Sequence, residues 1–175
     1  NFNELFDLEL SKFASVEAQA AALADDIAYD AHDIDDGLRS GLLTLSMLEE
    51  TPLPAQILSE VRAKYPSLDA VRTGHELMRR QITRMVEDAI GTSNARLAEL
   101  KPESVADIHN AAKQVVSFSE DMGTAEKELK RFMYAKLYRH PDVMEARRGA
   151  DRIVRDLFQH YFSNPRDMPE GWREG

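Results

Sequence analysis

The chain has 175 residues, of which 43% are hydrophobic and 30% charged, a length and composition that suit one domain or a substantial piece of a larger protein. Its 31 acidic and 22 basic residues give a formal net charge of −9, which does not support nucleic acid as a partner, because sequence-independent binding requires a basic surface. The sequence contains no cysteine, which excludes disulfides, thiolate metal sites and a cysteine nucleophile.

The first ten residues, NFNELFDLEL, are acidic and mixed in character, so they do not form a signal peptide. They also lack an initiator Met, and we expect the chain to begin inside a longer gene product. No apolar run approaches the roughly 18 residues of a membrane span. These features predict a cytoplasmic protein with no membrane partner.

Apolar residues recur with helical spacing almost throughout, and no sustained alternation indicates a strand, so the sequence predicts an all-α, multi-helix bundle. The first helix should begin after Ser15, a suitable N-cap, and Gly37 should end or bend it. Pro52 and Pro54 are expected to break the chain, before a small amphipathic helix over residues 55–64.

A long amphipathic helix follows, for which Ser67 is a candidate N-cap and Gly91 the residue just beyond the C-terminus. Ser104 is then expected to cap a short helix that ends at about Ala112. Thr124 should cap the next helix.

Pro141 is expected to end that helix, and the last helix should cover roughly residues 142–162 before Pro165 closes it. The result is a chain of about seven helices with short links and no internal repeat. It is predicted to form one all-α unit, with a subdomain change near Pro52 or after Gly91.

Residues 24–37, ADDIAYDAHDIDDG, concentrate aspartates in the middle of the first predicted helix. Asp25, Tyr29 and Asp33 are four residues apart, so they share one stripe of that helix. The apolar residues that would serve the core occupy a different stripe.

Asp26 and Asp30 form a second pair with the same spacing. Like charges four residues apart destabilise a helix, and aspartate is a poor helix former away from the first turn. A bound cation or a hydrogen-bonding ligand would offset this cost. The pattern therefore indicates either a solvated acidic face or a ligand site.

Two stretches of the chain resemble one known family. Residues 17–43 read EAQAAALADDIAYDAHDIDDGLRSGLL, and they resemble the Asp-containing helix of bacterial deoxyguanosine triphosphate triphosphohydrolase-like proteins, a branch of the HD-domain metal phosphohydrolases. Residues 132–172 read FMYAKLYRHPDVMEARRGADRIVRDLFQHYFSNPRDMPEGW, and they are similar to the C-terminal helices of that family. The resemblance covers nearly the whole chain. Its most specific part is ADDIAY followed by Asp33, and LYRHP supports it.

The resemblance implies that the chain is the C-terminal portion of such a protein. Residues 1–50 would be the C-terminal part of the HD catalytic domain, including the last metal-ligand helix. Residues 51–175 would be a helical C-terminal region packed against it in a single compact unit. Because these helices commonly support assembly in the family, we also expect a homo-oligomer.

The metal site of the family combines a His, a His-Asp dipeptide and one further Asp, and Asp25 matches that last ligand. Tyr29 and Asp33 match the Tyr and Asp that contact the deoxyribose near its 3′-hydroxyl. Helix geometry agrees with separate roles for Asp25 and Asp33. The rise between them is about 12 Å, whereas metal–ligand distances are about 2.0 to 2.2 Å. The two carboxylates could therefore hold different ends of an extended nucleotide, but not readily one ion.

The conspicuous His32-Asp33 dipeptide is not the metal-binding pair that the resemblance implies, because that pair lies upstream of this chain. His32 is about two turns beyond Asp25, and adjacent helical side chains point about 100° apart. We expect a partly exposed, hydrogen-bonding or interface histidine there. None of the other histidines has metal-ligand spacing, and we expect surface or packed side chains at His75, His109, His140 and His160.

The reaction that the resemblance implies is hydrolysis of a deoxynucleoside triphosphate to deoxynucleoside and inorganic triphosphate. A divalent metal, Mg²⁺ or Mn²⁺, would polarise the α-phosphoryl oxygen and orient a water. Because this chain holds one of the four expected protein ligands, we expect the isolated segment to be inactive. The alternatives are a non-enzymatic helical oligomerisation or regulatory module and a nucleotide sensor without catalysis.

Overall fold

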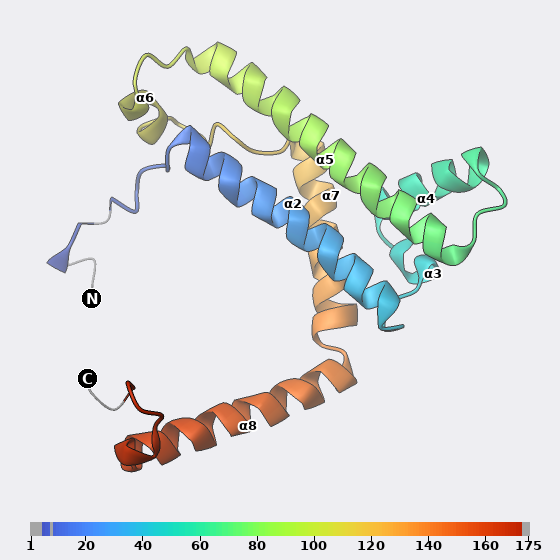
Figure 1. Ribbon diagram of the computed structural model, residues 1–175. Helices are drawn as coiled ribbons and strands as arrows, with labels where there is room; N and C mark the ends of the chain where they lie inside the picture. Colours follow the sequence, from blue (N-terminus) through green and yellow to red (C-terminus); the bar gives the residue numbers. More distant parts are fainter. Residues whose placement is uncertain (1–4, 8, 173–175) are drawn as a thin grey trace. The chain divides into compact units, whose positions relative to one another are not determined.

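The computed structural model describes residues 5–7 and 9–172 (Figure 1). This part of the chain contains seven α-helices, a π-helical segment and a 3₁₀ turn, and it has no strand, which confirms the all-α prediction. The chain divides into two compact units, Asn1–Met133 and Tyr134–Gly175. The assignment of residues 1–50 to a catalytic domain and of residues 51–175 to a C-terminal region remains a prediction.

Helix α2 (Val16–Arg39) begins as predicted, with Ser15 as its N-cap. The Ser15 hydroxyl accepts a hydrogen bond of 3.4 Å from the Ala18 amide. Gly37 does not end the helix, because the chain continues in helical conformation to Arg39. Its small size serves another purpose: a Cβ atom at Gly37 would lie 2.5 Å from Cδ1 of Leu43, so glycine permits the following turn to fold back closely.

Gly37→Ala is expected to destabilise the protein by about 1–2 kcal/mol, since overpacking typically costs 1–3 kcal/mol and the gain in helix propensity recovers up to about 1 kcal/mol. Gly91→Ala is the matched control, because a Cβ atom there meets nothing within 4 Å. It should stabilise the protein by up to about 1 kcal/mol. Urea-induced unfolding of both variants of the full-length protein measures the difference, and equal stability of the two would contradict the role assigned to Gly37.

Two short helices follow, α3 (Leu45–Leu48) and α4 (Pro52–Lys64). Pro52 begins α4 rather than breaking the chain, since proline at the first helical position has a suitable φ and its missing amide hydrogen is not needed there. The predicted helix over residues 55–64 therefore starts three residues earlier than expected.

Helix α5 (Ala70–Leu100) is longer than the sequence indicated. It is capped by Asp69 rather than Ser67, because the Asp69 carboxylate accepts a 2.8 Å hydrogen bond from the Arg72 amide. Gly91 was wrongly expected to end it, and the helix instead continues to Leu100, where its C-cap Lys101 has a left-handed φ of 48°. Glycine is tolerated inside a helix when the surrounding residues continue the pattern.

Helix α6 (Val105–His109) is capped by Ser104 as predicted, although it ends before Ala112. Helix α7 (Glu120–Met133) starts four residues before the predicted cap Thr124, which lies inside the helix. Ser119 precedes α7, and its amide and hydroxyl donate hydrogen bonds of 2.8 and 2.6 Å to the Asp88 carboxylate of α5. This pair of bonds joins the start of α7 to α5.

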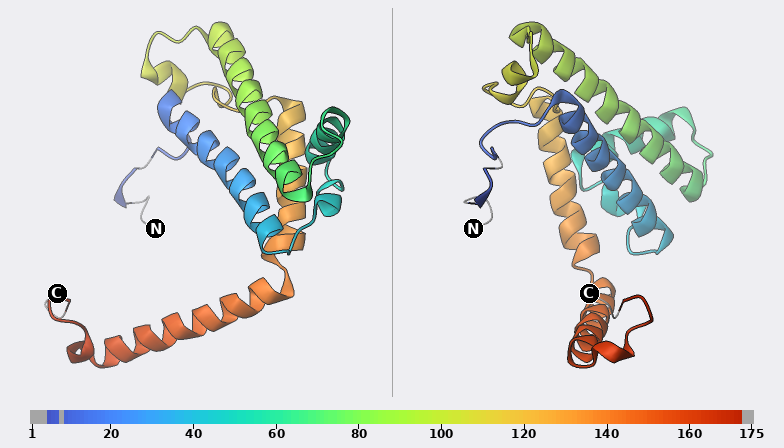
Figure 2. Two further views of the ribbon diagram at one scale, coloured as in Figure 1. Left: turned by 45° about the vertical axis from the view of Figure 1, so that its right-hand side comes forward. Right: turned by 60° about the vertical axis from the view of Figure 1, so that its left-hand side comes forward.

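The core of the first unit lies where α5 packs between α2 and α4, with α7 packed against α2 and α4 (Figures 1 and 2). Gln19 of α2 also binds the segment before α7, because its side-chain oxygen accepts 3.0 Å hydrogen bonds from the amides of Val115 and Val116. The most deeply buried apolar side chains are Ile34, Leu43, Leu48, Ile57, Leu58, Val61, Leu77, Met85, Leu129 and Met133. This packing fixes the orientation of α2, the helix that carries the acidic segment.

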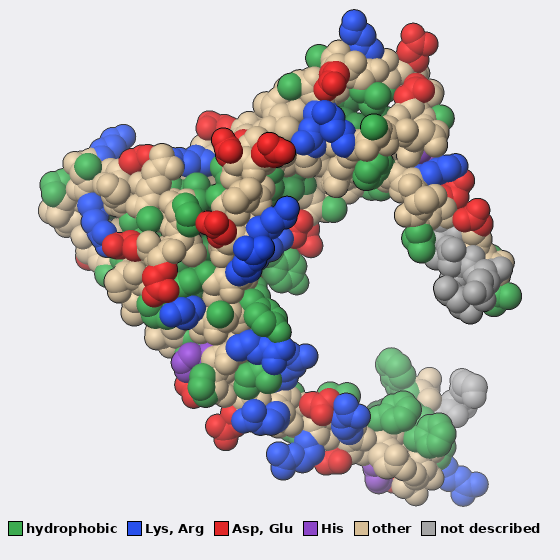
Figure 3. Space-filling model, turned by 180° about the vertical axis from the view of Figure 1, so that it is seen from behind, with side chains coloured by type: hydrophobic (Ala, Val, Ile, Leu, Met, Phe, Trp, Pro, Cys, Tyr) green, Lys and Arg blue, Asp and Glu red, His purple; other side chains and the backbone are tan. Residues whose placement is uncertain are grey.

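The second unit consists of the π-helical segment Tyr134–Tyr138, α8 (Pro141–Ser163) and a 3₁₀ turn at Pro165–Asp167. The predicted last helix over residues 142–162 is confirmed almost to the residue. None of the residues of α8 is buried, and apolar side chains gather at the C-terminal part of this unit beside Lys and Arg side chains (Figure 3). None of the helices in the described part of the chain combines the length and apolar content that crossing a membrane requires.

Candidate functional site

The three residues predicted to form the site, Asp25, Tyr29 and Asp33, lie on one face of α2. Asp25 and Tyr29 are both exposed, and the Tyr29 side chain retains 62% of its accessible surface. Within the described residues, Asp25 makes no hydrogen bond or ion pair. Asp33, one turn further on, is half-buried and has an interaction partner. The structure thus places the three residues on successive turns, and it leaves the first two available to a ligand.

Asp30, in contrast, is directed into the protein. Its side chain is 5% exposed, and its Oδ2 atom has no hydrogen-bond partner among the described residues. Burial raises the pKa of the Asp30 carboxyl to about 7, against the opposing charge of Lys130 and with the support of the negative charges of Glu126, Asp26 and Asp33. A buried carboxyl in such surroundings holds its proton into the neutral range.

Lys130 of α7 links these acidic groups. Its ammonium lies 2.9 Å from a carboxylate oxygen of Asp26 and also pairs with Glu126. Desolvation lowers the pKa of Lys130, but the hydrogen bonds to these two carboxylates outweigh it and raise the pKa overall. The repulsion between Asp26 and Asp30 is therefore offset by a cation of the chain itself, Lys130 of α7.

The sequence reasoning missed this buried cluster, although a signal was present. Asp30 follows Ile27 by three residues and precedes Ile34 by four, so it lies in the apolar stripe of α2 rather than on its polar side. A charged residue in a core stripe indicates a buried polar contact. Its partners could not be identified, because they lie about 100 residues further along the chain.

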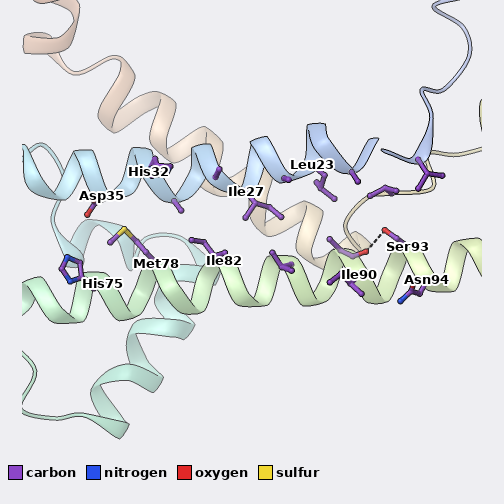
Figure 4. A pocket seen from close by; sticks show the side chains of 18 of the residues that line it. Leu23, Ile27, His32, Asp35, His75, Met78, Ile82, Ile90, Ser93 and Asn94 are labelled. Atoms are coloured by element: carbon purple, nitrogen blue, oxygen red, sulfur yellow. Dashed lines mark hydrogen bonds between the residues drawn. The ribbon is translucent and has the colours of Figure 1, made fainter. Parts of the chain in front are cut away.

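A groove of about 690 Å³ runs between α2 and α5 within the first unit (Figure 4). Its lining is mainly apolar, with Ala and Leu side chains from α2 and Ile, Val and Met side chains from α5. His32, Asp35 and His75 give one end a polar character. Neither Asp25 nor Tyr29 lines this groove, although their neighbours Ala24 and Ala28 do.

The described residues contain no group of three or more His, Asp or Glu side chains that could hold a metal ion. His32 is exposed and lines the groove, but among the described residues it makes none of the hydrogen bonds that we expected. His140 caps α8, and His160 lies 2.9 Å from the Asp167 carboxylate. The only predicted metal ligand, Asp25, could therefore bind a metal only together with ligands from outside this part of the chain.

Comparison with known proteins extends the resemblance over the whole chain. Residues 116–175 match the phosphohydrolase-associated domain. All 175 residues align at 59% identity with deoxyguanosinetriphosphate triphosphohydrolase-like protein 1 of Mesorhizobium japonicum, of which they cover 43%. A similarly named protein of Brucella anthropi is 57% identical over 175 residues, and the chain covers 44% of it.

The chain is a partial homologue of deoxyguanosinetriphosphate triphosphohydrolase-like proteins. The resemblance inferred from ADDIAY and LYRHP is thereby confirmed. The chain spans less than half the length of these relatives, and most of a triphosphohydrolase-like protein therefore lies outside it.

Proposed function

We propose that the full-length protein containing this chain hydrolyses a deoxynucleoside triphosphate to a deoxynucleoside and inorganic triphosphate. The observation that carries this proposal is the 59% identity, over all 175 residues, to a relative named as deoxyguanosinetriphosphate triphosphohydrolase-like. In the reaction, water attacks the α-phosphorus, the bond to the 5′-oxygen breaks, and the deoxynucleoside leaves with a proton on that oxygen.

Asp25 is proposed to contribute one carboxylate oxygen to a divalent metal, Mg²⁺ or Mn²⁺. Its exposure and its lack of a competing cation among the described residues fit this role. When bound, the ion supplies a Lewis acid that polarises a phosphoryl oxygen and lowers the pKa of bound water. The contribution of this chain is to hold the Asp25 carboxylate on a helix whose orientation is fixed by the core.

Tyr29 and Asp33 are proposed to position the deoxyribose. The exposed phenol of Tyr29 offers a ring face and one hydroxyl, and the Asp33 carboxylate can accept a hydrogen bond from a 3′-hydroxyl beside its existing interaction. Their spacing along α2 would place the sugar one to two turns from the metal. Ordering the sugar in this way aligns the α-phosphate for attack.

The proposal extends to location and assembly. A cytoplasmic protein would meet the deoxynucleotide pool. A homo-oligomer would bury apolar side chains that α8 leaves exposed, among them Ile153, Leu157 and Phe158.

The isolated chain of residues 1–175 is expected to release no triphosphate from deoxynucleoside triphosphates with either Mg²⁺ or Mn²⁺. It should also bind Mn²⁺ no more tightly than a single exposed carboxylate does, because Asp25 lacks its partner ligands. Ion chromatography of the reaction and titration calorimetry with Mn²⁺ measure the two properties. Manganese-dependent triphosphate release by this segment would show that its own residues complete a site.

The proposed activity is tested by incubating the full-length protein with each of the four deoxynucleoside triphosphates and GTP, with Mg²⁺ or Mn²⁺. Chromatography should detect deoxynucleoside and triphosphate in equal amounts. Stepwise release of orthophosphate would overturn the proposal, because it indicates attack at the γ-phosphorus. Absence of any hydrolysis would favour the alternative that follows.

The alternative function is a non-enzymatic helical module that oligomerises, regulates or senses nucleotide. The exposed apolar residues of α8 favour it, because an interaction module must present such a surface. If the module senses nucleotide, a deoxynucleoside triphosphate should raise the melting temperature of the full-length protein without being hydrolysed, whereas a module that only oligomerises should show no shift. The substrate panel and a thermal-shift measurement together separate the two functions.

A further inference from the structure

The groove between α2 and α5 is built from two matched stripes. On α5, Ile82, Val86 and Ile90 are four residues apart and remain 39%, 37% and 57% exposed. On α2, Ala20, Ala24 and Ala28 repeat with the same spacing. Each stripe therefore extends about 12 Å along its helix. Together they line a trough whose α5 wall carries large apolar side chains, and whose α2 wall carries these alanines together with Leu23 and Ile27 (Figure 4).

These features indicate which kind of structural element would cover the groove. A contiguous apolar trough is unfavourable in water and marks a surface that another element covers. Alanine side chains on the α2 wall allow a helix backbone to approach closely, and the branched side chains of α5 can fill the spaces between its residues. The trough thus fits the apolar face of an amphipathic helix.

We infer that the α2–α5 groove seats an amphipathic helix from the part of the full-length protein that lies outside residues 1–175. More than half the length of the relatives lies outside the matched segment, so ample chain exists to supply it. The inference rests on the proposed function and extends it, because it states how the remainder of the protein docks onto this chain.

The position of the groove relative to Asp25 supports this occupant over a second copy of the chain. Ala24 and Ala28 line the groove and directly precede Asp25 and Tyr29, respectively, on α2. A helix seated on those alanines would stand beside the candidate metal ligand. The missing ligands of a site that includes Asp25 must come from elements brought close to this segment of α2.

Cysteine labelling of the full-length protein tests the inference, because residues 1–175 contain no cysteine of their own. Ile90→Cys places a thiol in the groove, and Val105→Cys on α6, which is 60% exposed and does not line the groove, is the matched control. Maleimide modification is followed by peptide mass spectrometry, with the guanidine-denatured protein as the reference for full reactivity. The groove thiol should react at least about 10-fold more slowly than the control thiol, since it is exposed only when the docked helix opens.

Equal reactivity of the two thiols in the native protein would overturn the inference. Protection of Ile90→Cys that disappears on dilution into the monomer would also overturn it, because a second copy would then be the occupant. A photo-crosslinking residue at position 90 that joins a peptide outside residues 1–175 of the same molecule would support it.

The labelling result is independent of turnover. An active enzyme with an unprotected groove contradicts only the docking, whereas a protected groove in a protein that hydrolyses no deoxynucleotide contradicts only the proposed activity.

Discussion

Asp25→Ala in the full-length protein is expected to reduce the rate of triphosphate release by about 10³-fold or more while leaving the fold intact. Loss of a metal ligand removes several kcal/mol of transition-state stabilisation, and each 1.36 kcal/mol corresponds to a tenfold change in rate. Folding should be unaffected, since the Asp25 carboxylate is exposed and contacts no partner among the described residues. Removing a mid-helix aspartate in favour of alanine should even stabilise α2 slightly.

The matched control is Asp121→Ala, the same exchange at an exposed position in the first turn of α7. It should retain the activity of the wild type within about twofold, because surface substitutions away from a site have small effects. Both variants should be compared at saturating metal, with the melting temperature as the measure of folding. Turnover by Asp25→Ala at the control rate would show that Asp25 is not a metal ligand. It would not contradict the proposed hydrolysis reaction.

The parts of the fold that the sequence predicted well depend on local chemistry. Ser15 and Ser104 cap helices as expected, because an N-cap side chain acts on amides only two or three residues away. The spacing of Asp25, Tyr29 and Asp33 on one helix is equally local, and the structure retains it.

The glycines were misjudged because glycine permits a helix end but does not impose one. Gly37 and Gly91 both lie inside helices. At Gly37 the determining factor is the close approach of Leu43, a contact that no local pattern indicates.

The sequence predicted the parts of the candidate site that depend on local helix geometry, but not the parts that depend on tertiary contacts. The positions of Asp25 and Tyr29 follow from helix periodicity, but the burial of Asp30 depends on Lys130 and Glu126, which only the tertiary fold brings near. The apolar pattern of α5 correctly indicated a packed face. Part of that face, at Ile82 and Ile90, remains exposed because no described residue covers it.

Asp30→Asn is expected to stabilise the protein at pH 8 and to have little effect near pH 4. The folded carboxyl has a pKa of about 7, above its ordinary value of 3.8, because it is buried. Between these two pH values the folded state holds a proton that the unfolded state has lost. The free energy of unfolding of the wild type therefore decreases as the pH rises through this window, and it levels off above pH 7.

An asparagine at position 30 keeps the shape of the protonated side chain and carries no charge at any pH, so it avoids this loss. Its stabilising effect should grow by about 2–3 kcal/mol between pH 5 and pH 8, which corresponds to about two pKa units at 1.36 kcal/mol each. Urea-induced unfolding of the full-length protein in EDTA measures it without a contribution from bound metal.

Asp26→Asn is the control for the Asp30 experiment. Asp26 lies one turn away, its side chain is 53% exposed, and it pairs with the same Lys130 ammonium. Because Asp26 is exposed and paired with a cation rather than buried, the effect of its exchange should not change between pH 5 and pH 8. If Asp30→Asn behaves like Asp26→Asn, then the Asp30 carboxyl is ionised inside the folded protein across this range. The positive charge of Lys130 would then outweigh the desolvation of Asp30, and this buried residue would carry a full negative charge beside the proposed nucleotide face.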